Sequence, residues 1–250
     1  MKSNPIISVQ DLVKKYSNSS VTALNSINLT IYEGEIVGLL GPNGAGKTTF
    51  FSILCGLLVP TKGKVIIDGK QLDKELNLIK KQIGVVPQDV ALYPTLTGRE
   101  NLLFIGRMYG LKGADLKRKV DNALNDFGFN ENRNHAVNKY SGGMKRRVNL
   151  IAGILHQPKI IFLDEPTVGI DVQSRMAMME HLKKINLEQK TTIIYTSHYM
   201  EQAAQFCDNV AILDEGSILE KGTPKELIKK YNCESLEEVF IQLTGKKIRD

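Results

Sequence analysis

A glycine-rich segment with one lysine and two threonines follows a short apolar run early in the chain. It consists of Gly41, Pro42, Asn43, Gly44, Ala45, Gly46, Lys47, Thr48 and Thr49. Glycines permit a tight turn and let backbone N–H groups approach phosphate oxygens, and the positive end of a following helix favours an anion. In this pattern the Lys47 ammonium reaches the β- and γ-phosphates, and the Thr48 hydroxyl binds Mg²⁺. The segment therefore predicts a site for a nucleoside triphosphate.

Two acidic residues, Asp164 and Glu165, follow the apolar run at 160–163. A buried parallel strand delivers the side chains at its carboxyl end to the crevice of an open α/β sheet. There we predict that Asp164 holds Mg²⁺, directly or through water, and that Glu165 orients and polarises the attacking water. The alternative is a pair of solvated acids at a strand end, which the upstream phosphate-binding segment disfavours.

The elements that must position these sites follow an α/β pattern. We expect β-rich runs at residues 6–13, 27–32, 36–40 and 64–68. Between 97 and 128, apolar residues recur at helical spacing with charges between them, which predicts a small helical insertion. Beyond it, apolar runs at 160–163 and 192–196 flank a helical stretch at about 174–185. This strand–helix–strand rhythm predicts a parallel sheet with helices on its faces.

Composition and charge narrow the class of protein. The 250 residues are 42% hydrophobic and 24% charged, as in ordinary globular domains. Three cysteines without ligand spacing indicate neither a disulfide framework nor a zinc site and fit a reducing cytosol. The most apolar stretch, at 50–59, is far shorter than the ~20 residues that span a bilayer, so we expect no crossing of a membrane by this chain alone and no secretion signal. The formal charge of +6 leaves an anionic small ligand, a membrane surface or nucleic acid open as partners.

A third motif lies between the two predicted sites, at residues 140–147. The residues that would open a helix there, with an anion-binding N-terminus, are Ser141, Gly142 and Gly143. Here the sequence resembles the ATP-binding cassette (ABC) ATPases, whose signature reads LSGGQ, although Tyr140 replaces the leucine and Met144 the glutamine. The resemblance implies that this motif meets the γ-phosphate of an ATP held by a second ABC ATPase subunit. We therefore expect an ATP-sandwiched dimer, formed by two copies of this chain.

The same resemblance implies roles for four further residues. Tyr16 resembles the aromatic residue that stacks on adenine. Gln88 resembles the glutamine that senses Mg²⁺ and the attacking water, in a loop that borders the surface facing the membrane domain. Asp171 matches the aspartate that links the two active sites across the dimer, and His198 matches the switch histidine that contacts the γ-phosphate. The implied catalytic residues are Glu165, His198, Lys47 and Gln88, and the implied Mg²⁺ ligands are Thr48, Gln88 and Asp164.

The resemblance covers about residues 6–222 and implies a fold. We expect a P-loop NTPase (RecA-like) α/β core with an antiparallel β subdomain and an inserted α-helical subdomain. The ABC ATPase domain would occupy residues 1–222, with the helical subdomain at about 89–146. A helical C-terminal tail is expected over residues 223–250.

In function, the resemblance implies an ATP-binding and ATP-hydrolysing subunit that uses ATP and Mg²⁺ to power transport through a separate polytopic membrane permease. Residues 140–147 and 236–245 are similar to bacterial exporters of the drug-resistance, multidrug and ABC-2 type. Export of a lipophilic compound, drug, peptide or glycolipid is therefore expected. The chain would lie in the cytoplasm, held on the inner face of the cell membrane by the permease.

Two other functions stay open at this point. The first is a soluble ABC ATPase that acts on nucleic acid or ribosomes. Because the basic residues are dispersed and only 6% of residues are aromatic, we expect no nucleic-acid partner. The second is a non-enzymatic regulator with a degenerate site, which is disfavoured because Lys47, Asp164, Glu165 and His198 are all present.

Overall fold

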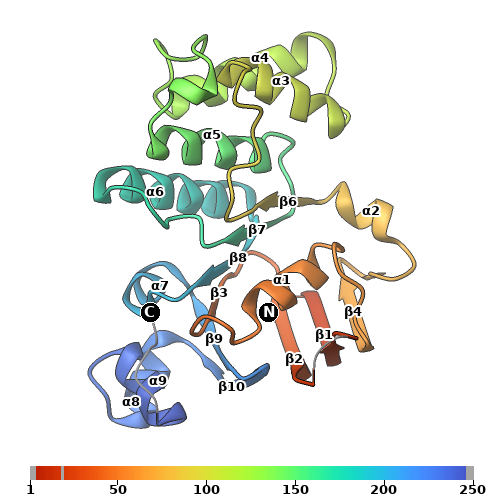
Figure 1. The fold of residues 1–250 in the computed structure, drawn as a ribbon, viewed down its shortest axis with the longest axis vertical. Coiled ribbons are helices and arrows are strands. Elements are labelled where there is room, and N and C mark those ends of the chain that lie inside the picture. The colour runs from red at the N-terminus through yellow and green to blue at the C-terminus, as the bar shows by residue number, and fades with distance from the viewer. Residues whose placement is uncertain (1–3, 18–19, 246–250) are drawn as a thin grey trace.

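Two sheets organise the molecule (Figure 1), whose computed structural model describes residues 4–17 and 20–245. Within this part of the chain, the central sheet has six strands in the order β10-β9-β3-β8-β7-β6, and the N-terminal sheet has four in the order β2-β1-β4-β5. The central strands are β3 (Ile36–Leu40), β6 (Ile83–Val86), β7 (Ile160–Asp164), β8 (Thr192–Ser197), β9 (Asn209–Asp214) and β10 (Ser217–Gly222). The N-terminal strands are β1 (Pro5–Lys15), β2 (Thr22–Tyr32), β4 (Lys62–Ile67) and β5 (Lys70–Gln71).

The central sheet is parallel except for β10, which pairs antiparallel with β9. Every residue of β3, β7 and β8 is buried, as expected for parallel strands covered on both faces. Along β7, Ile160 and Phe162 pack into one core, whereas Ile161 and Leu163 pack into the other, because successive side chains of a strand point to opposite faces. The sheet therefore separates two hydrophobic cores.

Helices cover both faces of the central sheet. Helix α1 (Lys47–Leu54) packs in the core that the central sheet shares with the N-terminal sheet. The opposite face carries α5 (Gly142–Ile154), α6 (Val172–Gln189), α7 (Met200–Phe206), α8 (Pro224–Tyr231) and α9 (Leu236–Thr244). The short α2 (Leu76–Lys80) precedes β6. Among the helices of residues 4–17 and 20–245, none combines the length and the apolar character needed to cross a bilayer.

Helices α3 (Gly98–Met108) and α4 (Gly113–Asp126) lie together at the end of the molecule that is uppermost in Figure 1. With them, the expected fold class is confirmed: a P-loop α/β core, an antiparallel β subdomain and an inserted helical subdomain. The boundary predicted near 146 falls inside α5, which continues into the core. The division at 222 stays a prediction, and residues 1–3, 18–19 and 246–250 lie outside the described residues.

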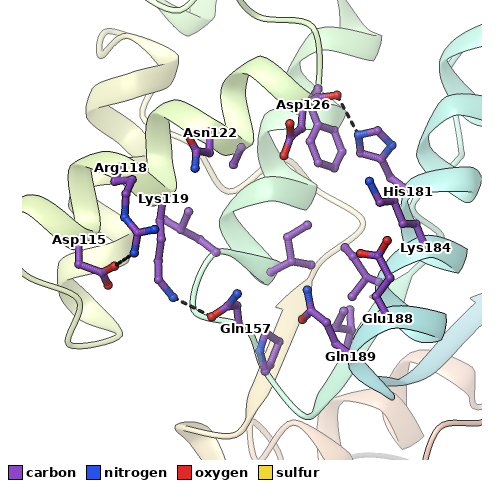
Figure 2. Close-up of a pocket in the computed structure, with 17 residues that line it drawn as sticks. Asp115, Arg118, Lys119, Asn122, Asp126, Gln157, His181, Lys184, Glu188 and Gln189 are labelled. Atoms are coloured by element: carbon purple, nitrogen blue, oxygen red, sulfur yellow. Dashed lines mark hydrogen bonds and ion pairs between the residues drawn. The ribbon is translucent and has the colours of Figure 1, made fainter.

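A groove of about 670 Å³ separates α4 from α6 (Figure 2). Two hydrogen bonds bridge it: His181 Nε2 lies 2.9 Å from the backbone oxygen of Asp126, and Lys119 Nζ lies 2.8 Å from Gln157 Oε1. Cations and anions both line the groove, so its charge selects no class of ligand. The two bridges tie α4 to α6 and to the loop between α5 and β7.

The close approach of β6 to α5 gives a prediction about stability. A Cβ at Gly84 would overlap the carbonyl oxygen of Gly153 and lie 2.9 Å from Pro158 Cγ. Since overpacking of a core costs about 1–3 kcal/mol and occasionally more, we expect Gly84→Ala to lower the free energy of unfolding by about 3 kcal/mol. Urea unfolding followed by circular dichroism measures this change. Gly222→Ala is the control, because the nearest atoms to its Cβ would be side-chain atoms, Leu227 Cδ2 at 3.3 Å and Glu226 Oε2 at 3.7 Å. An equal loss in both variants would contradict the prediction.

Candidate functional site

The phosphate-binding segment joins the end of β3 to the start of α1, as predicted. Gly46 caps the helix with a φ of 104°, a region that favours glycine. A Cβ at this position would also lie 2.7 Å from the carbonyl oxygen of Ala23, on β2. The tight turn therefore requires glycine on two grounds, and it places Lys47 at the first residue of the helix.

The Lys47 ammonium lies inside this turn. Its Nζ donates hydrogen bonds to the backbone oxygens of Gly41, at 2.8 Å, and Pro42, at 3.1 Å, and the residue is only 5% exposed. Burial lowers the pKa of Lys47, while the nearby Glu165 and Asp164 carboxylates act in the opposite direction. The site therefore holds a cation where the sequence predicts phosphate.

Asp164 is the last residue of β7 and Glu165 follows it; in the sheet, β8 lies between β7 and β3. Asp164 is 6% exposed, and burial raises its pKa, with a hydrogen bond from Thr196 opposing that shift. Glu165 departs from the strand with a φ of 45°, a left-handed conformation that is uncommon for a residue other than glycine. Such a backbone persists only where its surroundings hold it.

The Glu165 carboxylate lies at the centre of the site. Its Oε1 is 3.6 Å from Lys47 Nζ and 3.2 Å from His198 Nδ1, and its Oε2 is 3.5 Å from Gln88 Nε2. These partners come from α1, from the loop after β8 and from the loop after β6. The fold thus brings together the four side chains that the family resemblance implies are catalytic, although they are far apart along the chain.

A cavity of about 210 Å³ opens beside this cluster. Its lining residues come from the phosphate-binding segment, from β2 and from two of the loops at the sheet edge: Ala23, Pro42, Asn43, Gly44, Gly46, Lys47, Thr48, Thr49, Gln88 and Glu165. The three residues expected to hold Mg²⁺, Thr48, Gln88 and Asp164, all offer oxygen atoms, and two of them, Thr48 and Gln88, line this cavity. Such a set fits Mg²⁺, which takes oxygen ligands and is commonly held by one or two carboxylates together with substrate phosphates.

Tyr16 follows β1 and is exposed at the edge of this site. The residue is 42% exposed, and its hydroxyl lies 3.3 Å from Thr49 Oγ1. The Lys14 ammonium lies 5.3 Å from the centre of the ring. An aromatic face thus lies next to the helix that carries the phosphate-binding residues.

The signature residues form a second cluster on the surface. Ser141 caps α5, accepting a hydrogen bond from the backbone N–H of Met144 at 3.2 Å. A Cβ at Gly143 would lie 3.4 Å from Asp171 Oδ2, so α5 begins beside the loop that precedes α6. Asp171 accepts a hydrogen bond from Ser174 N at 2.8 Å, and this bond lowers the pKa of Asp171. None of the residues in this cluster lines the cavity beside Lys47.

Two further residues, Arg146 and Thr196, contact the site, although no sequence motif assigns them a role. Arg146, on α5, donates a hydrogen bond to the backbone oxygen of Gln88, which ties the signature helix to the loop after β6. Thr196, on β8, contacts both acidic residues through its hydroxyl. In the sequence, Thr196 could have been identified as part of the site only from its place at the end of an apolar run, two residues before His198.

Comparison with known proteins agrees with this geometry. Residues 24–168 match the family model described as "ABC transporter". The linearmycin resistance ATP-binding protein LnrL of Bacillus subtilis (strain 168) is 40% identical over 245 residues, which cover 98% of this chain and 76% of that protein. The probable multidrug ABC transporter ATP-binding protein YbhF of Escherichia coli (strain K12) is 35% identical over 243 residues, 95% of this chain but 41% of that protein.

Among solved structures, the chain is similar to the ATP-binding cassette MJ0796 in a dimeric post-hydrolysis state bound to ADP and Pi. The TM-score is 0.80 and the identity 30%, over 87% of this chain and 98% of that one. That chain is thus matched over almost its whole length.

Proposed function

The chain belongs to the ABC transporter family, and on this premise we propose that it uses Mg²⁺-ATP to drive transport through a separate membrane-spanning partner. It is an ABC ATPase. The observation that carries the proposal is the convergence of Lys47, Gln88 and His198 on the buried Glu165 carboxylate, beside a cavity lined by the phosphate-binding segment.

Each residue of the cluster has a part in the proposed hydrolysis. Lys47 binds the β- and γ-phosphates, and Glu165 orients and polarises the attacking water. His198 contacts the γ-phosphate, and Gln88 lies where it can sense that water. Thr48, Gln88 and Asp164 would hold Mg²⁺; when bound, this ion neutralises the charge that develops on the transferring phosphoryl group.

The adenine and the second subunit complete the proposed site. Tyr16 would stack on adenine, since its ring is exposed next to α1. ABC cassettes similar to this chain form dimers. We place the γ-phosphate of the partner's ATP against Ser141, Gly142 and Gly143, at the exposed N-terminus of α5. Val172 and Met176, exposed by 60% and 57% beside this cluster, would be covered in a dimer of two copies of this chain.

An apolar groove of about 590 Å³ supports the proposal that the chain binds a membrane protein. It lies beside the loop that carries Gln88 and is lined by apolar and aromatic side chains that include Leu57, Pro87, Tyr93, Phe104 and Met108. Leu57 is 69% and Met108 73% exposed, and clustered exposed apolar residues mark a protein contact. We propose that an apolar cytoplasmic segment of a polytopic permease binds there and holds the chain at the inner face of the membrane.

The cargo and its direction are inferred from relatives. LnrL is named for resistance to linearmycin, and YbhF for multidrug transport. We propose that this chain likewise powers export of a lipophilic compound, drug, peptide or glycolipid. The cargo path would belong to the permease, because the roles proposed for this chain are nucleotide binding and contact with the permease.

Purification of the partner tests the proposal. Tagged Glu165→Gln, expected to bind ATP without turnover, is purified with Mg²⁺-ATP from detergent-solubilised native cells, and the companions are identified by mass spectrometry. We expect a polytopic membrane protein, which Met108→Glu in the same background should lose. Leu187→Glu is the matched control, because Leu187 is 72% exposed on α6, outside the groove, and should leave the capture unchanged. Recovery of ribosomal or DNA-bound proteins without any membrane protein would overturn the transport function in favour of a soluble ABC ATPase.

A further inference from the structure

The hydroxyl of Thr196 lies between the two acidic residues of the site. Its Oγ1 donates a hydrogen bond to Asp164 Oδ1 at 2.6 Å and accepts one from the backbone N–H of Glu165 at 3.0 Å. Thr196 is completely buried, and so are both hydrogen bonds. One hydroxyl therefore contacts a side chain that would hold Mg²⁺ and the backbone of the residue that would activate water.

The register of the sheet explains this contact. Asp164 and Thr196 are direct partners in the parallel pair of β7 and β8. Phe162 and Ile194, two residues earlier in each strand, point into the core that contains α1. Because side chains alternate with a period of two, Asp164 and Thr196 point to that same face, the one that carries the phosphate-binding segment. A small hydroxyl side chain at this position of β8 can reach both acids.

The backbone of Glu165 depends on the same hydroxyl. Its φ of 45° is unfavourable for a residue with a Cβ and has to be held by its surroundings. The hydrogen bond from its N–H to Thr196 supplies such a restraint at the residue whose carboxylate meets His198 at 3.2 Å. His198 follows Thr196 by two residues. The end of β8 therefore restrains the backbone of Glu165 and also carries the histidine that its carboxylate meets.

We propose that Thr196 is a positioning residue for ATP hydrolysis, which fixes the Asp164 carboxylate for Mg²⁺ and the backbone of Glu165 for its contact with water. The inference rests on the roles proposed above for these two acids. Groups that orient a metal-binding carboxylate typically change metal affinity or activity by 10–100-fold when they are removed. Thr196 acts through its neighbours and does not itself contact the nucleotide.

The test compares substitutions that remove or keep the hydroxyl. Thr196→Val replaces the hydroxyl by a methyl group of similar size, Thr196→Ala removes both the hydroxyl and the methyl group, and Thr196→Ser keeps the hydroxyl. We expect Thr196→Val and Thr196→Ala to lower kcat about 10-fold and to raise several-fold the Mg²⁺ concentration needed for half-maximal ATP binding, measured by calorimetry. ATP binding in excess EDTA should be unchanged, and Thr196→Ser should restore most of both quantities.

Thr192→Val is the matched control. Thr192 lies on the same strand, is equally buried, and accepts a hydrogen bond from Gly34 N at 2.9 Å, far from the acids. It should lose comparable thermal stability but keep the wild-type kcat and Mg²⁺ dependence. Equal effects of Thr192→Val and Thr196→Val, or wild-type values for Thr196→Val and Thr196→Ala, would overturn the inference. Full turnover in Glu165→Gln would instead remove the proposed role of Glu165, whatever Thr196 does.

Discussion

Replacing Glu165 by glutamine is expected to lower the rate of ATP hydrolysis by about 10²–10⁴-fold, the range of general base catalysis. The amide has nearly the shape of the carboxylate, so it can keep the contacts with Gln88 and the backbone fold. It has no negative charge, however, and cannot polarise a water molecule or balance the Lys47 ammonium, which lies 3.6 Å away. Chemistry should therefore be lost while the site stays intact.

ATP binding separates this outcome from unfolding. The affinity of Glu165→Gln for ATP, measured by calorimetry, should stay close to that of the wild type. Because bound ATP is not consumed, gel filtration with Mg²⁺-ATP should show a stable dimer for this variant. Glu188→Gln, an exposed change of the same type on α6, should hydrolyse ATP normally and form no trapped dimer. Wild-type turnover in Glu165→Gln would exclude Glu165 from the role of catalytic base.

The parts of the site that the sequence predicts well are those built from contiguous residues. The segment from β3 through the glycine-rich turn to α1 is continuous in the chain, so its glycines, Lys47 and Thr48 can be identified without knowing the sheet order. The runs at 160–163 and 192–196 were predicted almost to their ends, because parallel strands buried on both faces are continuously apolar. The local sequence pattern is therefore enough to predict these elements.

Other strands escaped prediction because their sequences are ambiguous. β6 (Ile83–Val86) is short and contains Gly84, which is there for the close approach of α5. β9 (Asn209–Asp214) is a short apolar run, and such runs cannot be told from buried helical segments by periodicity alone. Both strands are specified by their neighbours in the sheet.

The role of Thr196 depends on register. The sequence separates Thr196 from Asp164 by 32 residues, and only the pairing of β7 with β8 brings their side chains together. A shift of one residue in that pairing would send Thr196 to the other face of the sheet. The same reasoning applies to the contact of Arg146 with the loop after β6, since α5 lies on that strand through tertiary packing.

Replacing Lys47 by alanine should produce a different loss, in binding as well as in turnover. The ammonium is held by the backbone oxygens of Gly41 and Pro42 and faces the Glu165 carboxylate. On binding, the ammonium would pair with the phosphates, and truncating one partner of such a buried charge pair costs about 2–5 kcal/mol of binding free energy. In the variant, Glu165 stays buried without its cation, and an incoming triphosphate meets that negative charge directly. We expect the Kd for Mg²⁺-ATP to rise at least ~30-fold, which corresponds to the lower limit of that range.

The two substitutions together divide the site by function. Calorimetry with Mg²⁺-ATP should give near wild-type affinity for Glu165→Gln and greatly weakened affinity for Lys47→Ala, while both variants lose turnover. Lys64→Ala, an exposed lysine change on β4, controls for the loss of one positive charge and should leave affinity and rate unchanged. Unchanged affinity and rate in Lys47→Ala would contradict the assignment of the glycine-rich segment. The expected pattern follows from the geometry, because Lys47 belongs to the turn that holds phosphate, whereas Glu165 reaches the same cavity from the end of another strand.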